Sequence, residues 1–267
     1  SKKSKTNTHS YIPELVSKLR KGEVTRRDFL QTATLLGVSA GAAYTMAGMP
    51  APGRKAHAAA KKGGNLRVSM NVKATDDPAT FDWSEKGNVA RHVTEPLVRV
   101  GEDGLARPYL AESWSASEDL KTWTFNLRKN ATWSNGDSFG ADDVIHNFRR
   151  WLDPNTGSSN QGRFSSMTTT SDTGKKDENG NAIMSTTEAG GALEKIDDHT
   201  VRFHLNNADL ALPESMADYP ALIVHKNFDD EGGDLIKNPV GTGPYALKDF
   251  AVGEKATLVR RSDAAWW

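Results

Sequence analysis

The segment that most restricts the fold of this chain lies near its beginning, where residues 25–30 read T-R-R-D-F-L. The adjacent Arg26 and Arg27 precede an uncharged stretch from Phe29 to Gly53, and this order is typical of a twin-arginine export signal. Small-residue cleavage motifs follow at 56–58 and 58–60. We therefore expect residues 1–60 to be a signal peptide cleaved near residues 58–60, which leaves residues 61–267 to build a periplasmic protein.

A permanent membrane anchor is the competing interpretation of the same stretch. The uncharged run is long enough to cross a bilayer core, which needs about 20 apolar residues. Between residues 32 and 49, however, the run is rich in Ala, Gly, Thr and Ser and only weakly apolar. This composition favours a cleaved signal over an anchor.

The zero net charge of the chain conceals an asymmetry. Residues 1–60 hold ten basic and three acidic side chains, so 24 of the 34 basic and 31 of the 34 acidic side chains lie after residue 60. An acidic mature part argues against nucleic acid as a partner, because phosphate binding needs a basic face. The absence of cysteine excludes disulfides, thiolate metal sites and a lipid-modified cysteine.

Apolar periodicity predicts a mixed α/β fold after residue 64. The clearest strand is 121–128, where Trp123, Phe125 and Leu127 alternate with polar residues, and the clearest helix is 141–152, which Asp153-Pro154 ends. Other expected elements are a strand at 65–72, a short helix at 89–97 leading into a strand at 97–100, and strand pairs at 193–196 with 201–205 and at 245–247 with 256–259.

Residues 168–191 differ from their surroundings in composition. They are rich in Ser, Thr, Gly, Asp and Lys and contain few apolar side chains. Such a segment cannot contribute much to a core. We expect it to form a surface insertion.

No catalytic signature is present in the sequence. It contains no glycine-flanked nucleophilic serine, no phosphate-binding loop with its lysine and no His-Glu-x-x-His zinc motif. No histidines after residue 60 occur at a metal-ligand spacing. We therefore expect no metal and no other cofactor. The run Gly241-Thr242-Gly243 lacks the lysine and the following helix of a phosphate loop, so it predicts a turn with close backbone approach.

Five sequence blocks, taken in order, resemble the extracellular solute-binding proteins of the dipeptide and oligopeptide ABC-transporter family, family 5. The family hallmarks are an L-A-E-S-W segment, a W-T-F-x-L-R strand, an N-G or D-G turn, an A-D-D-V helix and a G-T-G-P-Y turn. Here they stand at residues 110–114, 123–128, 135–137, 141–144 and 241–245. Their order and separations also match, and they span most of residues 65–267.

The resemblance implies a type II periplasmic-binding-protein-like fold and a receptor, not an enzyme, that closes around a peptide or similar solute. Such a receptor delivers its solute to an ABC transporter permease in the inner membrane. The chain is similar to the first lobe of such a protein, with a small accessory subdomain, and the second lobe is missing. Family members continue well beyond Trp267, so we expect the chain to be truncated and half a cleft to bind weakly.

The resemblance also suggests where a ligand would lie. The loop at 82–85 and the stretch at 160–164 correspond to parts that approach the ligand in relatives, and we take Trp83, Glu85 and Phe164 as the candidate ligand-binding residues. Trp83 has an alternative role as a seal at the edge of the core. Family ligands include dipeptides, oligopeptides, opines, haem and nickel complexes, and the sequence selects none of them. Gly140 stands where relatives commonly have a helix-capping Thr or Ser.

Two other functions stay open. An exported enzyme is one, because twin-arginine export carries folded passengers, although the expected catalytic motifs are absent. A sensory or adaptor protein of the same fold is the other, since it would differ from a transport receptor only in its partner. The sequence best supports a solute receptor exported through the twin-arginine translocase.

Overall fold

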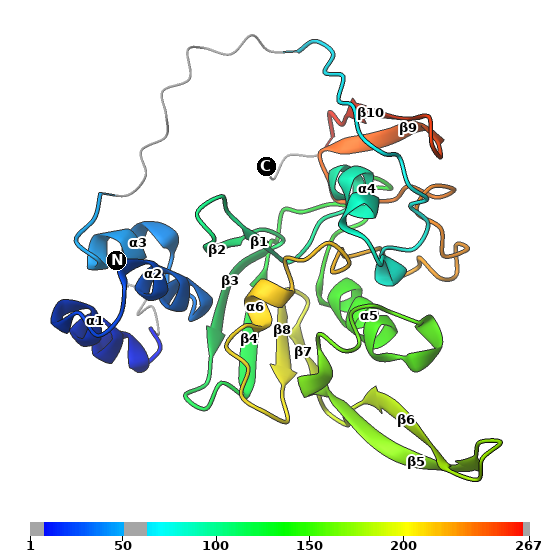
Figure 1. Cartoon of the computed structure of the whole chain (residues 1–267). Helices are drawn as coiled ribbons and strands as arrows, with labels where there is room; N and C mark the ends of the chain where they lie inside the picture. Colours follow the sequence, from blue (N-terminus) through cyan, green and yellow to red (C-terminus); the bar gives the residue numbers. More distant parts are fainter. Residues whose placement is uncertain (1–7, 51–62, 264–267) are drawn as a thin grey trace.

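The computed structural model describes residues 8–50 and 63–263. Three helices come first, α1 (Tyr11–Lys21), α2 (Arg26–Leu35) and α3 (Ala40–Met46), and they lie together beside strands β1 to β3 (Figure 1). Within the described ranges, no helix is both long enough and apolar enough to cross a bilayer. The proposed cleavage motifs at 56–60 lie outside the described residues.

The centre of the main body is a four-stranded antiparallel sheet in the order β3-β4-β8-β7. Its strands are β3 (Ala111–Ala116), β4 (Thr122–Leu127), β7 (Leu193–Asp197) and β8 (Thr200–His204). The alternation predicted for 121–128 is confirmed, because Trp123, Phe125 and Leu127 are buried and the residues between them are only partly buried. Burial of one face fixes the register, since a slip by one residue would turn the aromatic side chains toward water.

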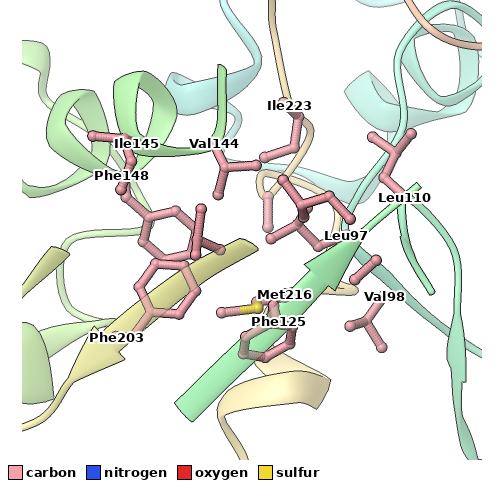
Figure 2. Close-up of a cluster of buried hydrophobic side chains, with 14 of the residues drawn as sticks. Leu97, Val98, Leu110, Phe125, Val144, Ile145, Phe148, Phe203, Met216 and Ile223 are labelled. Carbon is pink, nitrogen blue, oxygen red and sulfur yellow. The ribbon is translucent and has the colours of Figure 1, made fainter. Parts of the chain in front are cut away.

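Helix α5 (Ala141–Leu152) covers the buried face of this sheet. Figure 2 shows Val144 and Phe148 of the helix directed into the cluster that contains Phe125 and Phe203 of the strands, and Ile145 belongs to the same buried cluster. The ring centroids of Phe148 and Phe203 are 4.5 Å apart, within the range of favourable aromatic contacts. The helix has the bounds that the sequence predicts, because its apolar spacing, its acidic first turn and Asp153-Pro154 agree.

Gly140 directly precedes α5 and makes a close backbone contact that requires a glycine. Its amide donates to Asp143 Oδ2 at 2.9 Å, so the helix is capped from its third position. The neighbouring Ala141 amide donates to the Asp198 carbonyl oxygen at 2.8 Å. A Cβ atom on Gly140 would lie 2.8 Å from that oxygen. Glycine is therefore needed for the close approach of two chain segments.

Two smaller sheets complete the main body. Strands β1 (Val98–Val100) and β2 (Ala106–Pro108) form one antiparallel pair, and β9 (Tyr245–Ala251) and β10 (Lys255–Arg260) form the other. Helix α4 (Gly87–Val93) lies against β9, and the short helix α6 (Leu212–Ser215) lies against β1 (Figure 1). Single turns of 3₁₀ helix are η1 (Pro78–Thr80), η2 (Ser84–Lys86), η3 (Pro154–Thr156) and η4 (Ser165–Met167).

The strand expected at 65–72 is wrong. The described residues from 63 onward form no strand until β1, and Leu66 is 89% exposed. The bond from the Gly253 amide to the Val72 carbonyl oxygen, 2.9 Å, joins the end of this segment to the turn between β9 and β10. An alternating segment forms a strand only where a neighbouring strand supplies hydrogen-bond partners for its backbone. Among the described residues, no strand is paired with this segment.

Residues 168–191 form a hairpin that extends away from the body (Figure 1). Strands β5 (Thr168–Lys176) and β6 (Ala182–Glu188) pair antiparallel, and most of their side chains are exposed. The hydroxyl groups of Thr170 and Thr186 are 2.8 Å apart across the pair. The hairpin is largely exposed, and its regular β structure was not foreseen from the composition.

Candidate functional site

The loop that carries Trp83 and Glu85 is held to the body at its beginning. The Asp77 carboxylate accepts a bond from the Ala79 amide at 3.0 Å, which starts η1. The other Asp77 oxygen accepts a bond from Arg150 Nη2 of α5 at 2.8 Å. The rigid helix therefore fixes where the loop leaves the core.

The second candidate stretch lies against the same loop. Ser158 Oγ donates to the Ala79 carbonyl oxygen at 2.9 Å, and Ser159 Oγ donates to the Phe81 carbonyl oxygen at 2.7 Å. The Ser159 amide also donates to the Ala79 oxygen, at 3.1 Å. The two regions that the sequence analysis singled out, 82–85 and 160–164, thus adjoin one another through residues 158–159 and 79–81.

Trp83 and Glu85 themselves face solvent. Trp83 is 66% exposed, which is unusual for a tryptophan and does not fit a role as a core seal. The Glu85 carboxylate lies 3.9 Å from Lys73 Nζ, and both groups are about half exposed. Such a pair contributes little to stability, so the carboxylate is available to exchange partners.

An ion pair shapes the base of this loop. Lys86 Nζ lies 2.8 Å from Asp82 Oδ1. The hydrogen bond from Lys86 holds the pKa of the Asp82 carboxyl below its usual range. Asp82 is therefore charged at neutral pH, and it places a second carboxylate close to Trp83.

Phe164 does not share this exposure. Its side chain is fully buried, and its ring stacks on Trp151 of α5 with centroids 5.5 Å apart and 12° between planes. A second ring, Phe148, lies 5.0 Å away. Phe164 is a core residue in this lobe, so the expectation of a direct ligand contact by its side chain needs correction. The polar surroundings of Phe164 in the sequence concealed the aromatic cluster that it joins.

A charged cluster that no sequence pattern reveals lies beside the loop. Arg150 is largely buried, its Nε lies 2.9 Å from both carboxylate oxygens of Asp229, and its guanidinium stands 4.9 Å from the centre of the Phe228 ring. An open depression of about 460 Å³ lies over this cluster. Its lining residues are Asp77, His146, Arg149, Arg150, Asp153, Asn155, Thr156 and Asp229.

This cluster ties together three separated parts of the chain. Two carboxylates, Asp77 and Asp229, offset the charge of Arg150, as a largely buried guanidinium requires. The arrangement suits a structural anchor for the loop. Among the described residues, no group of three or more His, Asp or Glu side chains is placed to hold a metal ion.

The Gly241-Thr242-Gly243 turn has the close backbone approach that the sequence predicts. A Cβ atom on Gly241 would lie 1.8 Å from the Val93 carbonyl oxygen, and one on Gly243 would lie 2.4 Å from the His92 oxygen. The Gly243 amide donates to the Val93 oxygen at 2.8 Å. Glycine at both positions lets the turn lie directly on the end of α4, the helix that follows the Trp83 loop.

Arg261 clamps the turn from its other side. Its Nη1 donates to the carbonyl oxygens of Gly241 and Gly243 at 2.9 and 3.1 Å, and its Nη2 lies 3.0 Å from Asp263. Several buried donor bonds from one guanidinium fix the path of the chain as it leaves β10.

The comparisons with known proteins agree with this arrangement. The profile of the family described as "Bacterial extracellular solute-binding proteins, family 5 Middle" matches residues 106–267. The chain belongs to this family. The expected mixed α/β, periplasmic-binding-protein-like fold is likewise confirmed, because solved structures of such proteins match the lobe.

Relatives of this family 5 protein are named for different ligands. The periplasmic oligopeptide-binding protein OppA of Escherichia coli is 29% identical over 250 residues, which are 91% of this chain and 43% of that protein. The nickel-binding periplasmic protein of E. coli is 34% identical over 177 residues, 64% of this chain and 29% of that protein. Similarity alone therefore does not choose between a peptide and a metal complex.

A solved structure gives the same result for the fold. Haemophilus influenzae OppA in complex with the peptide RPPGFSPFR is 28% identical and has a TM-score of 0.56, over 71% of this chain and 36% of that chain. The present chain spans less than half the length of the relatives it matches. It corresponds to the N-terminal part of those proteins.

Proposed function

We propose that residues 61–267 form the first lobe of an exported receptor that captures a peptide or a similar small solute. The receptor would deliver the solute to the permease of an ABC transporter. The observation that carries this proposal is the family match together with an exposed aromatic and acidic loop held rigidly to the lobe. Tight capture would require a second lobe, because enclosure and desolvation of a ligand need two walls.

Trp83 and Glu85 are the proposed ligand contacts of this lobe. The exposed indole face of Trp83 offers a large, rigid apolar surface at little cost in conformational entropy. The Glu85 carboxylate can pair with a cationic group of the solute in exchange for its loose pair with Lys73. Phe164 would support the adjoining stretch from within the core and would not touch the solute.

The mechanism is capture by closure. A solute that contacts both lobes favours the closed state only by the contacts that the open state lacks. The loop must therefore keep one position while the second lobe moves. The bonds from Arg150, Ser158 and Ser159 give it that rigidity.

Export would use the twin-arginine translocase. Arg26 and Arg27 open α2, directly after Thr25, whose side chain accepts a bond from the Asp28 amide at 3.1 Å. Both arginines are exposed, as a recognition signal requires. N-terminal sequencing of the exported protein, from hosts with and without the translocase, tests this part. We expect a mature N-terminus near residue 61 only where the translocase is present.

A thermal-shift screen of the product of the complete reading frame would identify the solute. Dipeptides, oligopeptides, opines and metal chelates are screened separately, because binding to the folded state raises the melting temperature. We expect one class to raise it and Trp83→Ala to abolish that rise. The matched control is Met184→Ala, which truncates an exposed apolar side chain on the distant β6 strand.

Two results would contradict the proposal. The first is a stable product whose melting temperature responds to no solute. The second is a ligand-induced rise that Trp83→Ala leaves unchanged. For residues 61–267 alone we expect little stabilisation by any peptide, since half of the cleft is missing. Nanomolar binding by that segment would contradict this expectation.

A further inference from the structure

The N-terminal helices share an apolar core with the lobe. Phe29 and Ala33 of α2 are fully buried, and Ile12 and Leu15 of α1 are nearly so. Leu105 of the lobe, from the turn between β1 and β2, lies in the same cluster. Two further lobe residues contact the cluster at its edge, Leu120 and Leu210.

Hydrogen bonds connect the same two parts. Trp114 Nε1 of β3 donates to the Leu35 carbonyl oxygen at 2.9 Å. The Tyr44 hydroxyl of α3 donates to Asp103 Oδ2 at 3.4 Å. At the start of the helices, His9 Nε2 lies 3.2 Å from the Ser117 carbonyl oxygen. The segment from residue 9 to residue 44 is thus bonded to the lobe at both ends and in the middle.

A close backbone approach occurs at Gly37. This residue has φ = +86°, and a Cβ atom on it would lie 2.3 Å from the carbonyl oxygen of Trp114. Any other residue would push the connection between α2 and α3 away from β3. The interface is therefore specific in shape as well as apolar.

The docked helices hide one part of the signal and present another. Phe29 and Leu30, which begin the uncharged stretch, are buried in the shared core. Arg26 and Arg27, immediately before them, are exposed. Docking therefore leaves the two arginines in contact with solvent while it buries the apolar side chains that follow them.

We infer that the N-terminal helices are a folding-dependent cover, docked on a lobe surface formed by Leu105, Trp114, Leu120 and Leu210. This surface, the leader-docking surface, is assembled from residues between 105 and 120 and from Leu210, so it exists only after the lobe has folded. The inference rests on the proposed role of residues 1–60 as an export signal.

The cover has a physical consequence for export. An unfolded lobe offers no docking surface, so Phe29 and Leu30 stay exposed and free to enter a bilayer or to aggregate. A folded lobe shields these side chains and leaves only the arginine pair accessible. Cleavage near residues 58–60 would then release the helices and expose the leader-docking surface of the mature protein.

Hydrogen exchange on the full chain of residues 1–267 tests the docking. The variant is Gly37→Ala, and the matched control is Gly48→Ala. Both glycines have positive φ, but a Cβ atom on Gly48 meets nothing within 4 Å. We expect Gly37→Ala to speed amide exchange in residues 26–47 about ten-fold or more, with β4 and α5 unchanged, and Gly48→Ala to change it far less.

A second readout tests the shielding. Binding of the full chain to vesicles of phosphatidylethanolamine and phosphatidylglycerol should increase several-fold in Gly37→Ala. The same change is expected for Trp114→Phe, which removes the indole donor from the lobe side. Exchange in residues 26–47 that matches the parent in both variants would overturn the docking. Faster exchange without increased vesicle binding would overturn the role as a cover.

These outcomes are independent of the export experiment. If the N-terminus of the exported protein does not depend on the translocase, the proposed signal fails while the docking measurement still stands. If export depends on the translocase and Gly37→Ala leaves exchange unchanged, the signal holds and the cover fails.

Discussion

The side-chain amide of Asn147 is hydrogen-bonded in both directions to the backbone of Val224. Its Nδ2 donates to the Val224 carbonyl oxygen at 2.6 Å, and its Oδ1 accepts from the Val224 amide at 3.0 Å. All of these groups are buried. The Asn147 side chain thus satisfies the backbone of Val224 as the backbone of a neighbouring strand would. The irregular segment that contains Val224 continues along the chain to Asp229.

Replacing Asn147 by Ala should destabilise the lobe by about 3 kcal/mol, because two buried backbone groups lose their partners. The measurement is urea unfolding of the full chain. The control is Asn126→Ala, which removes an exposed amide that donates to Ser113 Oγ, and we expect a loss of less than about 1 kcal/mol. Equal effects of the two changes would contradict a special role for Asn147.

Gly140 gives a prediction opposite to the usual rule for helix caps. Ser at such a position normally stabilises a helix, but a Cβ atom here would lie 2.8 Å from the backbone oxygen of Asp198. We expect Gly140→Ser to lower the free energy of unfolding by about 1–2 kcal/mol. Gly162→Ser is the control, because a Cβ atom there meets nothing within 4 Å. Stabilisation by Gly140→Ser would show that the two segments separate easily.

The regular elements were predictable where local pattern and tertiary contact agree. Helix α5 and strand β4 have strong periodicity, and each buries the face that its periodicity selects. The segment at 65–72 has equal alternation, yet it forms no strand because no ladder partner stands beside it in the described residues. Strand formation depends on a neighbour that one segment of sequence does not reveal.

The candidate site was predictable in part for the same reason. Trp83 is exposed and Glu85 is partly buried in the segment that the sequence singles out, but Phe164 is buried because Trp151 and Phe148 pack against its ring. The anchor of the loop was missed entirely. Arg150 and Asp77 are 73 residues apart in the chain, and no local pattern joins them.

Arg150 should be important for stability and Arg149 should not. Replacing Arg150 by Gln leaves Asp77 and Asp229 near one another without their cation. We expect a loss of about 2–3 kcal/mol in urea unfolding, at the low end for a buried pair because Asp229 is half exposed. Arg149→Gln, at an exposed neighbouring position 3.8 Å from Glu188, should cost less than about 1 kcal/mol. A similar loss in both variants would contradict the anchor.

His146 should make the stability of the lobe depend on pH. Burial lowers the pKa of its imidazole, the nearby Arg150 acts in the same direction, and Asp229 at 3.5 Å opposes them. A histidine whose folded pKa lies below its ordinary value of about 6.5 binds its proton more weakly in the folded state than in the unfolded state. Its contribution is therefore complete above pH 6.5 and decreases as the pH falls toward and through the lowered pKa.

The measurement is the free energy of unfolding of the full chain as a function of pH, compared with His146→Asn. We expect the parent to lose more stability than the variant as the pH is lowered from about 6.5 toward and through the lowered pKa, because the neutral amide of Asn takes up no proton. The difference between the two curves isolates the histidine, since every other titratable group is common to both proteins. Parallel curves over this interval would mean that the attraction of Asp229 cancels the effect of burial.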